Sequence, residues 1–165
     1  MNNIPIKKRL IELLIDYFVI IAYLVMLLII NLSINFIIFK GFPVYTEFQA
    51  QMIAGLTAVI PIILIFSYLD YYTKGTIGKR VSGLKMTYAN YRFHSSLLRN
   101  IIKFLPWQLG HLGVIHGVYN DFDMAAVIIA NSGMFLGIVM LCMGLFRKDK
   151  CHLGDLIAGT KVELQ

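Results

Sequence analysis

The sequence is poor in charge and especially poor in acidic residues. Of its 165 residues only 15% are charged, with 9 Asp or Glu against 15 Lys or Arg. Ordinary soluble domains have about 25% charged and about 45–50% apolar residues, whereas this chain is 58% hydrophobic with a mean hydropathy of +0.73. The composition excludes an ordinary soluble domain and predicts a protein that crosses a membrane several times.

Cysteine is nearly absent, which excludes a disulfide framework. Cys142 lies in an apolar run and Cys151 in a basic tail, and both are predicted to be free thiols. Cys151 and His152 alone are too few for a zinc site. His111 and His116 are five residues apart, a spacing that does not place them on one helix face. We therefore expect no metal site.

Motifs for catalysis and for nucleic-acid binding are also missing. The net charge of +6 is accompanied by no zinc-finger or helix-turn-helix pattern, and no group of residues resembles a hydrolase site. The stretch GTIGKR at residues 75–80 lacks the spacing of a phosphate-binding loop. We expect that the protein is not an enzyme, needs no cofactor and binds no nucleic acid. Lys79 and Arg80 are instead predicted to contact anionic lipid headgroups.

Long apolar runs are what the sequence has in excess. Four runs cover about residues 10–32, 48–69, 97–119 and 124–146. About 20 apolar residues form a helix that crosses the roughly 30 Å hydrocarbon core. The third run carries Arg99 and Lys103, so it either crosses the membrane or begins as an interfacial helix. The predicted fold is an all-α membrane protein, a four-transmembrane-helix bundle that forms a single domain over residues 1–165.

The distribution of basic residues predicts the topology. If all four runs cross, 14 of the 15 Lys and Arg residues fall on one side, and only Lys40 lies opposite. Cytoplasmic segments carry the excess of Lys and Arg in membrane proteins. Both termini are therefore expected in the cytoplasm. A model with three spans would place the basic C-terminal tail outside, so the count favours a crossing by the third run as well.

A polar stripe interrupts the first apolar run. At 100° per residue, Arg9 and Asp16 lie within about 20° of each other on the helix face, with Glu12 about 60° away. An Asp near the centre of a membrane helix disfavours insertion by roughly 2.5–3.5 kcal/mol. Partners on other helices must offset this energy, so the stripe predicts a bundle.

Two further patterns concern packing. Gly133 and Gly137 have GxxxG spacing in the fourth run, which permits close helix approach and makes this face a candidate contact for a homo-oligomer or a membrane partner protein.

LKMTY at residues 84–88 and TKVEL at 160–164 are rich in strand-forming residues. Because the topology puts both on the same side, we expect them to pair as a small cytoplasmic β-strand pair.

Four motifs occur in an order that resembles a known family. They are Arg9 with Asp16, GTIGKRVSGLKM at residues 75–86, Leu98-Arg99-Asn100, and HLGDLIAGTKV at residues 152–162. Together they resemble the RDD family of bacterial membrane proteins, named for an arginine and two aspartates. The resemblance implies that these residues are Arg9, Asp16 and Asp155, and that the protein lies in the bacterial cytoplasmic (inner) membrane. Cation/proton exchange is attributed to some members.

The polar residues support two functional interpretations. We hypothesise that Arg9, Glu12, Asp16, Arg99 and Asp155 form one buried cluster near the cytoplasmic ends of the helices. Asp16 is then either a proton or cation site or one half of a structural ion pair, while Asp155 is expected to be structural. The first interpretation is a small antiporter for protons and monovalent cations. The second is a non-transporting membrane partner, an assembly, accessory or protective factor.

Overall fold

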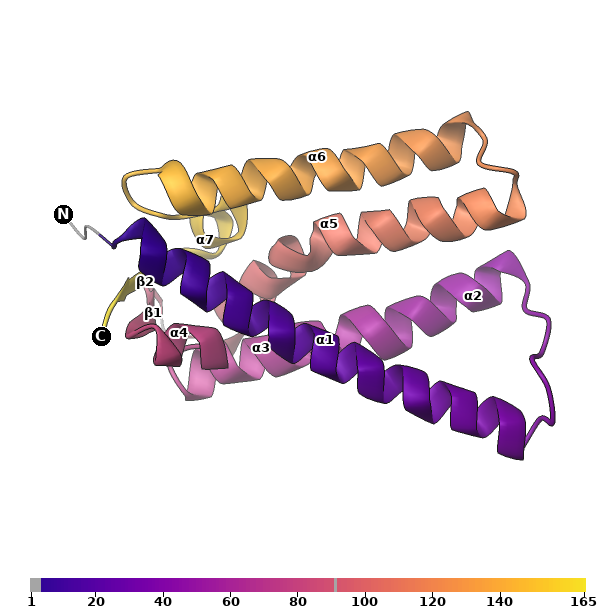
Figure 1. The fold of residues 1–165 in the computed structure, drawn as a ribbon. Coiled ribbons are helices and arrows are strands. Elements are labelled where there is room, and N and C mark those ends of the chain that lie inside the picture. Colours follow the sequence, from indigo (N-terminus) through magenta and orange to yellow (C-terminus); the bar gives the residue numbers. More distant parts are fainter. Residues whose placement is uncertain (1–3, 91) are drawn as a thin grey trace.

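The computed structural model describes residues 4–90 and 92–165. Within this part of the chain, four long helical segments lie side by side, and short helices and strands gather at the end that holds both termini (Figure 1). The long segments are α1 (Ile6–Ile37), the succession α2 (Glu47–Ala54), η1 (Gly55–Val59) and α3 (Ile60–Tyr72), then α5 (Phe93–Tyr119) and α6 (Met124–Phe146).

Three of these segments are long and apolar enough to cross a membrane, counted over the described residues: Ile6–Ile37, Glu47–Tyr72 and Met124–Phe146. The predicted spans 10–32 and 48–69 are extended at both ends, and 124–146 keeps its bounds. Helix α5 has 27 residues but is not among the three. Its first half carries Arg99 and Lys103, which lower its mean hydropathy.

The second segment changes its winding at η1, a stretch of π-helix that ends two residues before Pro61. Proline has no backbone N–H, so the carbonyl of Thr57 loses its helical partner. The hydroxyl of Tyr23 on α1 donates to this carbonyl at 2.5 Å. The sequence predicts a kink here, and the side chain of another helix satisfies the group that the proline leaves unpaired.

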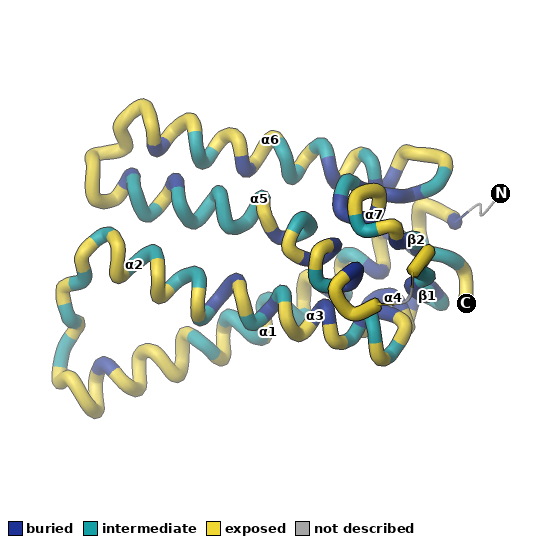
Figure 2. The backbone as a smooth tube through the Cα atoms, turned by 180° about the vertical axis from the view of Figure 1, so that it is seen from behind, coloured by how far each residue is buried: buried dark blue, intermediate teal, exposed yellow. Residues whose placement is uncertain are grey.

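Helix α1 is buried on its polar side and exposed on its apolar side. Its buried residues are Arg9, Glu12, Asp16 and Asn35, all of them polar or charged. Large apolar side chains cover most of its remaining surface, and much of α1 is coloured as exposed or half-buried in Figure 2. This arrangement suits a helix that faces lipid, because charged groups in a membrane must meet partners inside the bundle.

The predicted strand pair is confirmed. β1 (Leu84–Tyr88) pairs antiparallel with β2 (Thr160–Leu164), in a register that places Met86 opposite Val162. Ile4 and Leu84 complete a small apolar cluster with these two residues. The pair lies with α4 (Ile77–Val81) and α7 (Leu153–Ala158) at the end of the bundle where α1 begins (Figure 1).

The small residues of α6 bring it against α5. A Cβ added at Gly133 would lie 2.7 Å from the carbonyl oxygen of Pro106, and one at Gly137 would lie 3.5 Å from the Cβ of the same proline. Gly133 is buried. Gly133 therefore allows a close helix approach, as its spacing predicts, and the helix that it meets is α5 of the same chain. A partner protein on this face stays a prediction.

Candidate functional site

Eight charged side chains, seven of them buried and one half-buried, gather at the end of the bundle that carries the short helices and strands. Five elements supply them. They are Arg9, Glu12 and Asp16 from α1, Asp70 from α3, Lys79 from α4, Arg99 and Lys103 from α5, and Asp155 from α7. We refer to this set as the charge network. It joins elements that lie up to 146 positions apart in the sequence.

Arg9 anchors one edge of the charge network. Its Nη1 lies 2.6 Å from Oε2 of Glu12, one turn further along α1. Its Nη2 donates to the carbonyl oxygen of Lys150 at 3.0 Å, which ties the start of α1 to the segment after α6. Both Arg9 and Glu12 are almost fully buried, so each depends on the other to offset its desolvation.

Asp70 is the centre of the charge network. Its Oδ2 lies 2.7 Å from Nη1 of Arg99, and its Oδ1 lies 2.9 Å from Nζ of Lys79. The amide of Asn100 and the backbone N–H of Thr76 also donate to it, at 3.3 and 3.2 Å. Asp70 is not among the residues that the sequence analysis singled out. The sequence feature that could have indicated its role is an acidic residue at the end of an apolar run, nine residues before Lys79.

The prediction that Lys79 meets lipid headgroups is wrong. Its side chain is fully buried, and its Nζ lies 2.9 Å from Asp70 and 3.5 Å from Glu12. The ammonium is held between carboxylates of α1 and α3, out of reach of a lipid. The neighbouring Arg80 is exposed, so its contact with headgroups stays a prediction.

Asp155 binds Arg99 at the other edge of the charge network. Nε of Arg99 lies 2.6 Å from Oδ1 of Asp155, which also accepts from the hydroxyl of Thr160 at 2.9 Å. Burial alone would raise the pKa of Asp155, but the positive charge of Arg99 and the hydrogen bonds from Arg99 and Thr160 together outweigh burial and hold the pKa well below its ordinary value. Asp155 is therefore ionised and ties α7 to α5.

His152 caps the helix that carries Asp155. Its Nδ1 accepts from the backbone N–H of Gly154 at 3.0 Å, and Oδ2 of Asp155 accepts from the backbone N–H of His152 at 3.2 Å. Burial lowers the pKa of His152 to about 3 despite the opposing charge of Asp155. The imidazole is therefore neutral at pH 7 and adds no charge to the network.

The GTIGKR stretch holds the carboxylate of Asp16. The hydroxyl of Thr76 donates to Oδ2 at 2.7 Å, and the backbone N–H of Gly78 donates to Oδ1 at 2.9 Å. A Cβ at Gly78 would lie 2.6 Å from Oδ1. Glycine is thus required where α4 meets α1, and a motif that looks like a phosphate loop binds a side-chain carboxylate of the same chain.

Lys103 is the most loosely held cation of the charge network. Its Nζ lies 3.9 Å from Oδ2 of Asp16, and its side chain is 18% exposed. The ammonium stands 4.8 Å from the ring centre of Phe66 and 5.3 Å from that of Phe104, distances suited to cation–π attraction. No hydrogen bond to this ammonium is found within the described residues.

The formal charges of the network cancel. Four basic and four acidic side chains take part. The five residues expected to cluster, Arg9, Glu12, Asp16, Arg99 and Asp155, all lie within it. Sequence reasoning missed three members. They are Asp70, Lys79 and Lys103, and each completes a contact that only the tertiary structure brings about.

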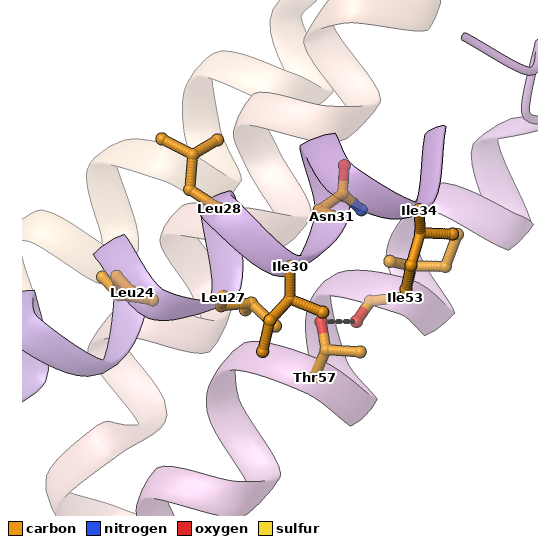
Figure 3. Close-up of a pocket in the computed structure, with 8 residues that line it drawn as sticks. All are labelled: Leu24, Leu27, Leu28, Ile30, Asn31, Ile34, Ile53 and Thr57. Atoms are coloured by element: carbon orange, nitrogen blue, oxygen red, sulfur yellow. Dashed lines mark hydrogen bonds between the residues drawn. The ribbon is translucent and has the colours of Figure 1, made fainter. Parts of the chain in front are cut away.

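The remaining polar groups and cavities are less suited to chemistry. A cavity of about 390 Å³ between α1 and α2 is lined mainly by Leu and Ile, and its one internal hydrogen bond joins Thr57 to the carbonyl of Ile53 (Figure 3). At the far end of the bundle His116 lies 2.7 Å from Glu47. In residues 4–90 and 92–165 no group of His, Cys, Asp and Glu is placed to hold a metal.

Comparison with known proteins assigns the chain to a family. The model of the RDD family matches residues 5–159, nearly the whole length. The chain belongs to the RDD family. The residues that carry the resemblance, Arg9, Asp16 and Asp155, all lie in the charge network of this RDD protein. No match is found among curated proteins or solved structures. The family and the apolar helices together indicate a membrane protein.

Proposed function

We propose that this RDD protein exchanges a monovalent cation for a proton across the bacterial cytoplasmic membrane, with Asp16 and Lys103 as the exchanging pair. The proposal rests on the longest ion-pair contact of the charge network, the 3.9 Å between these two side chains. The formal charges of the network also cancel. A cation that entered a neutral buried network would leave an uncompensated charge, unless a proton departed at the same time.

The exchange follows from this balance. A sodium, potassium or lithium ion binds the carboxylate of Asp16 in place of the Lys103 ammonium. Lys103 then releases one proton and becomes a neutral amine, so the network has the same charge before and after. The rings of Phe66 and Phe104 lie beside Nζ of Lys103, so the neutral amine can pack against them and does not compete for the carboxylate.

The other carboxylates are poor candidates for exchange. Asp70 and Asp155 each have an Arg99 nitrogen within 2.7 Å, and Glu12 has Arg9 at 2.6 Å. A cation at any of these sites must break a close ion pair, and removing one partner from such a buried pair is disfavoured by about 3–5 kcal/mol. Asp16 is the member whose partner is most easily displaced.

We further propose that α5 crosses the membrane as a fourth span. It lies alongside α6 through most of its length (Figure 1), and small residues bring the two helices close, since a Cβ at Gly113 would lie 2.5 Å from the backbone nitrogen of Ala130. With four spans both termini are cytoplasmic, and 14 of the 15 basic residues lie on that side. A reporter fused after Gln165 that appeared outside the cell would contradict this topology.

The role of a non-transporting partner has less support. Its predicted contact face includes Gly133, which is packed against α5 of the same chain. A homo-oligomer, the absence of enzymatic activity and the absence of a cofactor stay predictions.

Proton flux in proteoliposomes tests the proposal. The purified protein is reconstituted, gradients of sodium, potassium or lithium are imposed in turn, and internal pH is followed. Wild type should show cation-driven proton flux, Asp16→Asn should abolish it, and Asp149→Asn should retain it, because Asp149 pairs with Arg147 outside the network. Absence of flux in folded wild type, or equal flux in Asp16→Asn, would refute cation exchange.

A further inference from the structure

A cavity of about 230 Å³ lies beside the charge network, between α1, α5 and α6. Its lining combines two kinds of side chain. Arg9, Lys103 and His152 border it, and its walls are apolar, with Leu13 on α1, Trp107 on α5, and Met140 and Leu141 on α6. Leu141 is 48% exposed, so the cavity reaches the outer surface of the bundle.

The basic groups of the cavity are not equally engaged. Arg9 donates to Glu12 and to the carbonyl of Lys150, and His152 is neutral. Lys103 has three N–H donors and, within the described part of the chain, meets Asp16 at 3.9 Å and two aromatic rings. A buried donor without an acceptor is unfavourable. The ammonium of Lys103 can therefore bind an anionic oxygen in the cavity while it stays near Asp16.

The position of the cavity fits the border between headgroups and hydrocarbon. Helix α1 has 32 residues, about 48 Å at 1.5 Å per residue, which exceeds the roughly 30 Å hydrocarbon core by about 18 Å. If the helix is centred, about 9 Å lies outside the core at each end. Arg9 is then about 5 Å from the start of α1 and at headgroup level, and Leu13, at about 10 Å, marks the border.

We infer that this cavity binds one anionic phospholipid, with its phosphate bound by the Lys103 ammonium and an acyl chain along the apolar walls. Gly137 and Gly144 of α6 leave room for the chain. A Cβ at Gly144 would lie 3.6 Å from Nη2 of Arg9, an ordinary van der Waals distance. The combination of a loosely held ammonium and apolar walls selects a ligand that has one anionic group and a hydrocarbon chain.

Native mass spectrometry tests this site. The full protein is released from micelles that contain equal amounts of phosphatidylglycerol and phosphatidylcholine. Wild type should retain one phosphatidylglycerol in preference to phosphatidylcholine. Lys103→Gln should weaken retention at least tenfold, because it removes a charge-assisted contact, and Lys103→Arg should preserve it. An excess of inorganic phosphate should not displace the lipid.

A pair of glycine variants tests the cavity without changing charge. Gly137→Leu places a side chain in the cavity and should abolish retention. Gly110→Leu is the matched control, because no atom lies within 4 Å of its added Cβ, and it should retain the lipid. Equal retention of both lipids by wild type, displacement by phosphate alone, or equal behaviour of the two leucine variants would overturn the inference. Retention is measured without an ion gradient, so its failure would not bear on cation exchange.

Discussion

Replacing Asp70 with asparagine tests whether the charge network holds the bundle together. The carboxylate is fully buried and lies within 2.9 Å of both Lys79 and Arg99. The substitution would leave these two buried cations with one carboxylate partner fewer. Loss of one partner from a buried ion pair typically lowers stability by about 3–5 kcal/mol. We expect Asp70→Asn to lower the free energy of unfolding by that amount, measured in mixed micelles by titration with denaturing detergent.

A second substitution separates charge imbalance from lost packing. Asp70→Asn with Lys79→Met restores neutrality, so we expect the double variant to be at least about 1 kcal/mol more stable than the sum of the two single effects. Asp149→Asn is the control, since its pair with Arg147 is exposed and contributes about 0–1 kcal/mol. If Asp70→Asn destabilises the protein no more than this control, the charge network is not what holds these helices together.

Three further predictions address single residues. Gly78→Ala should destabilise the protein, because its Cβ would lie 2.6 Å from Oδ1 of Asp16, whereas Gly41→Ala, with open space around its Cβ, should unfold at the wild-type temperature. His152 has a folded-state pKa of about 3 against an ordinary 6.5, so stability should fall as the pH is lowered from 6.5 toward 3, by at most about 1.4 kcal/mol per pH unit. Unfolding curves of His152→Gln should lack this part of the slope. Gly133→Leu should separate α5 from α6 and reduce the yield of folded protein; normal yield would contradict the packing described.

Local patterns predicted most of the helices and the strand pair. The apolar runs marked the long helices, and the strand-forming residues of LKMTY and TKVEL marked β1 and β2. The run at residues 97–119 was ambiguous because Arg99 and Lys103 lower its hydropathy, although their charges are matched by Asp70, Asp155 and Asp16 in the folded chain. The hydropathy of a sequence counts each charge without its partner. It therefore underestimates how well a helix with paired charges fits an apolar environment.

The site was predicted in part for a related reason. The stripe of Arg9, Glu12 and Asp16 follows from helical geometry alone. Lys79 stands in a stretch with other basic residues, which is typical of a headgroup contact, and only the fold shows that it turns inward to Asp70. The GxxxG spacing around Gly133 predicted a close helix contact, but a spacing cannot say which helix makes it.

Proton release on cation binding tests the central claim, that a neutral network accepts a cation only by giving up a proton. The protein in weakly buffered detergent solution is mixed with sodium chloride, and a pH indicator reports released protons, with choline chloride as the control for ionic strength. We predict about one proton per bound sodium ion in wild type and none in Asp16→Asn. Sodium binding without proton release, or equal release in Asp16→Asn, would contradict the account.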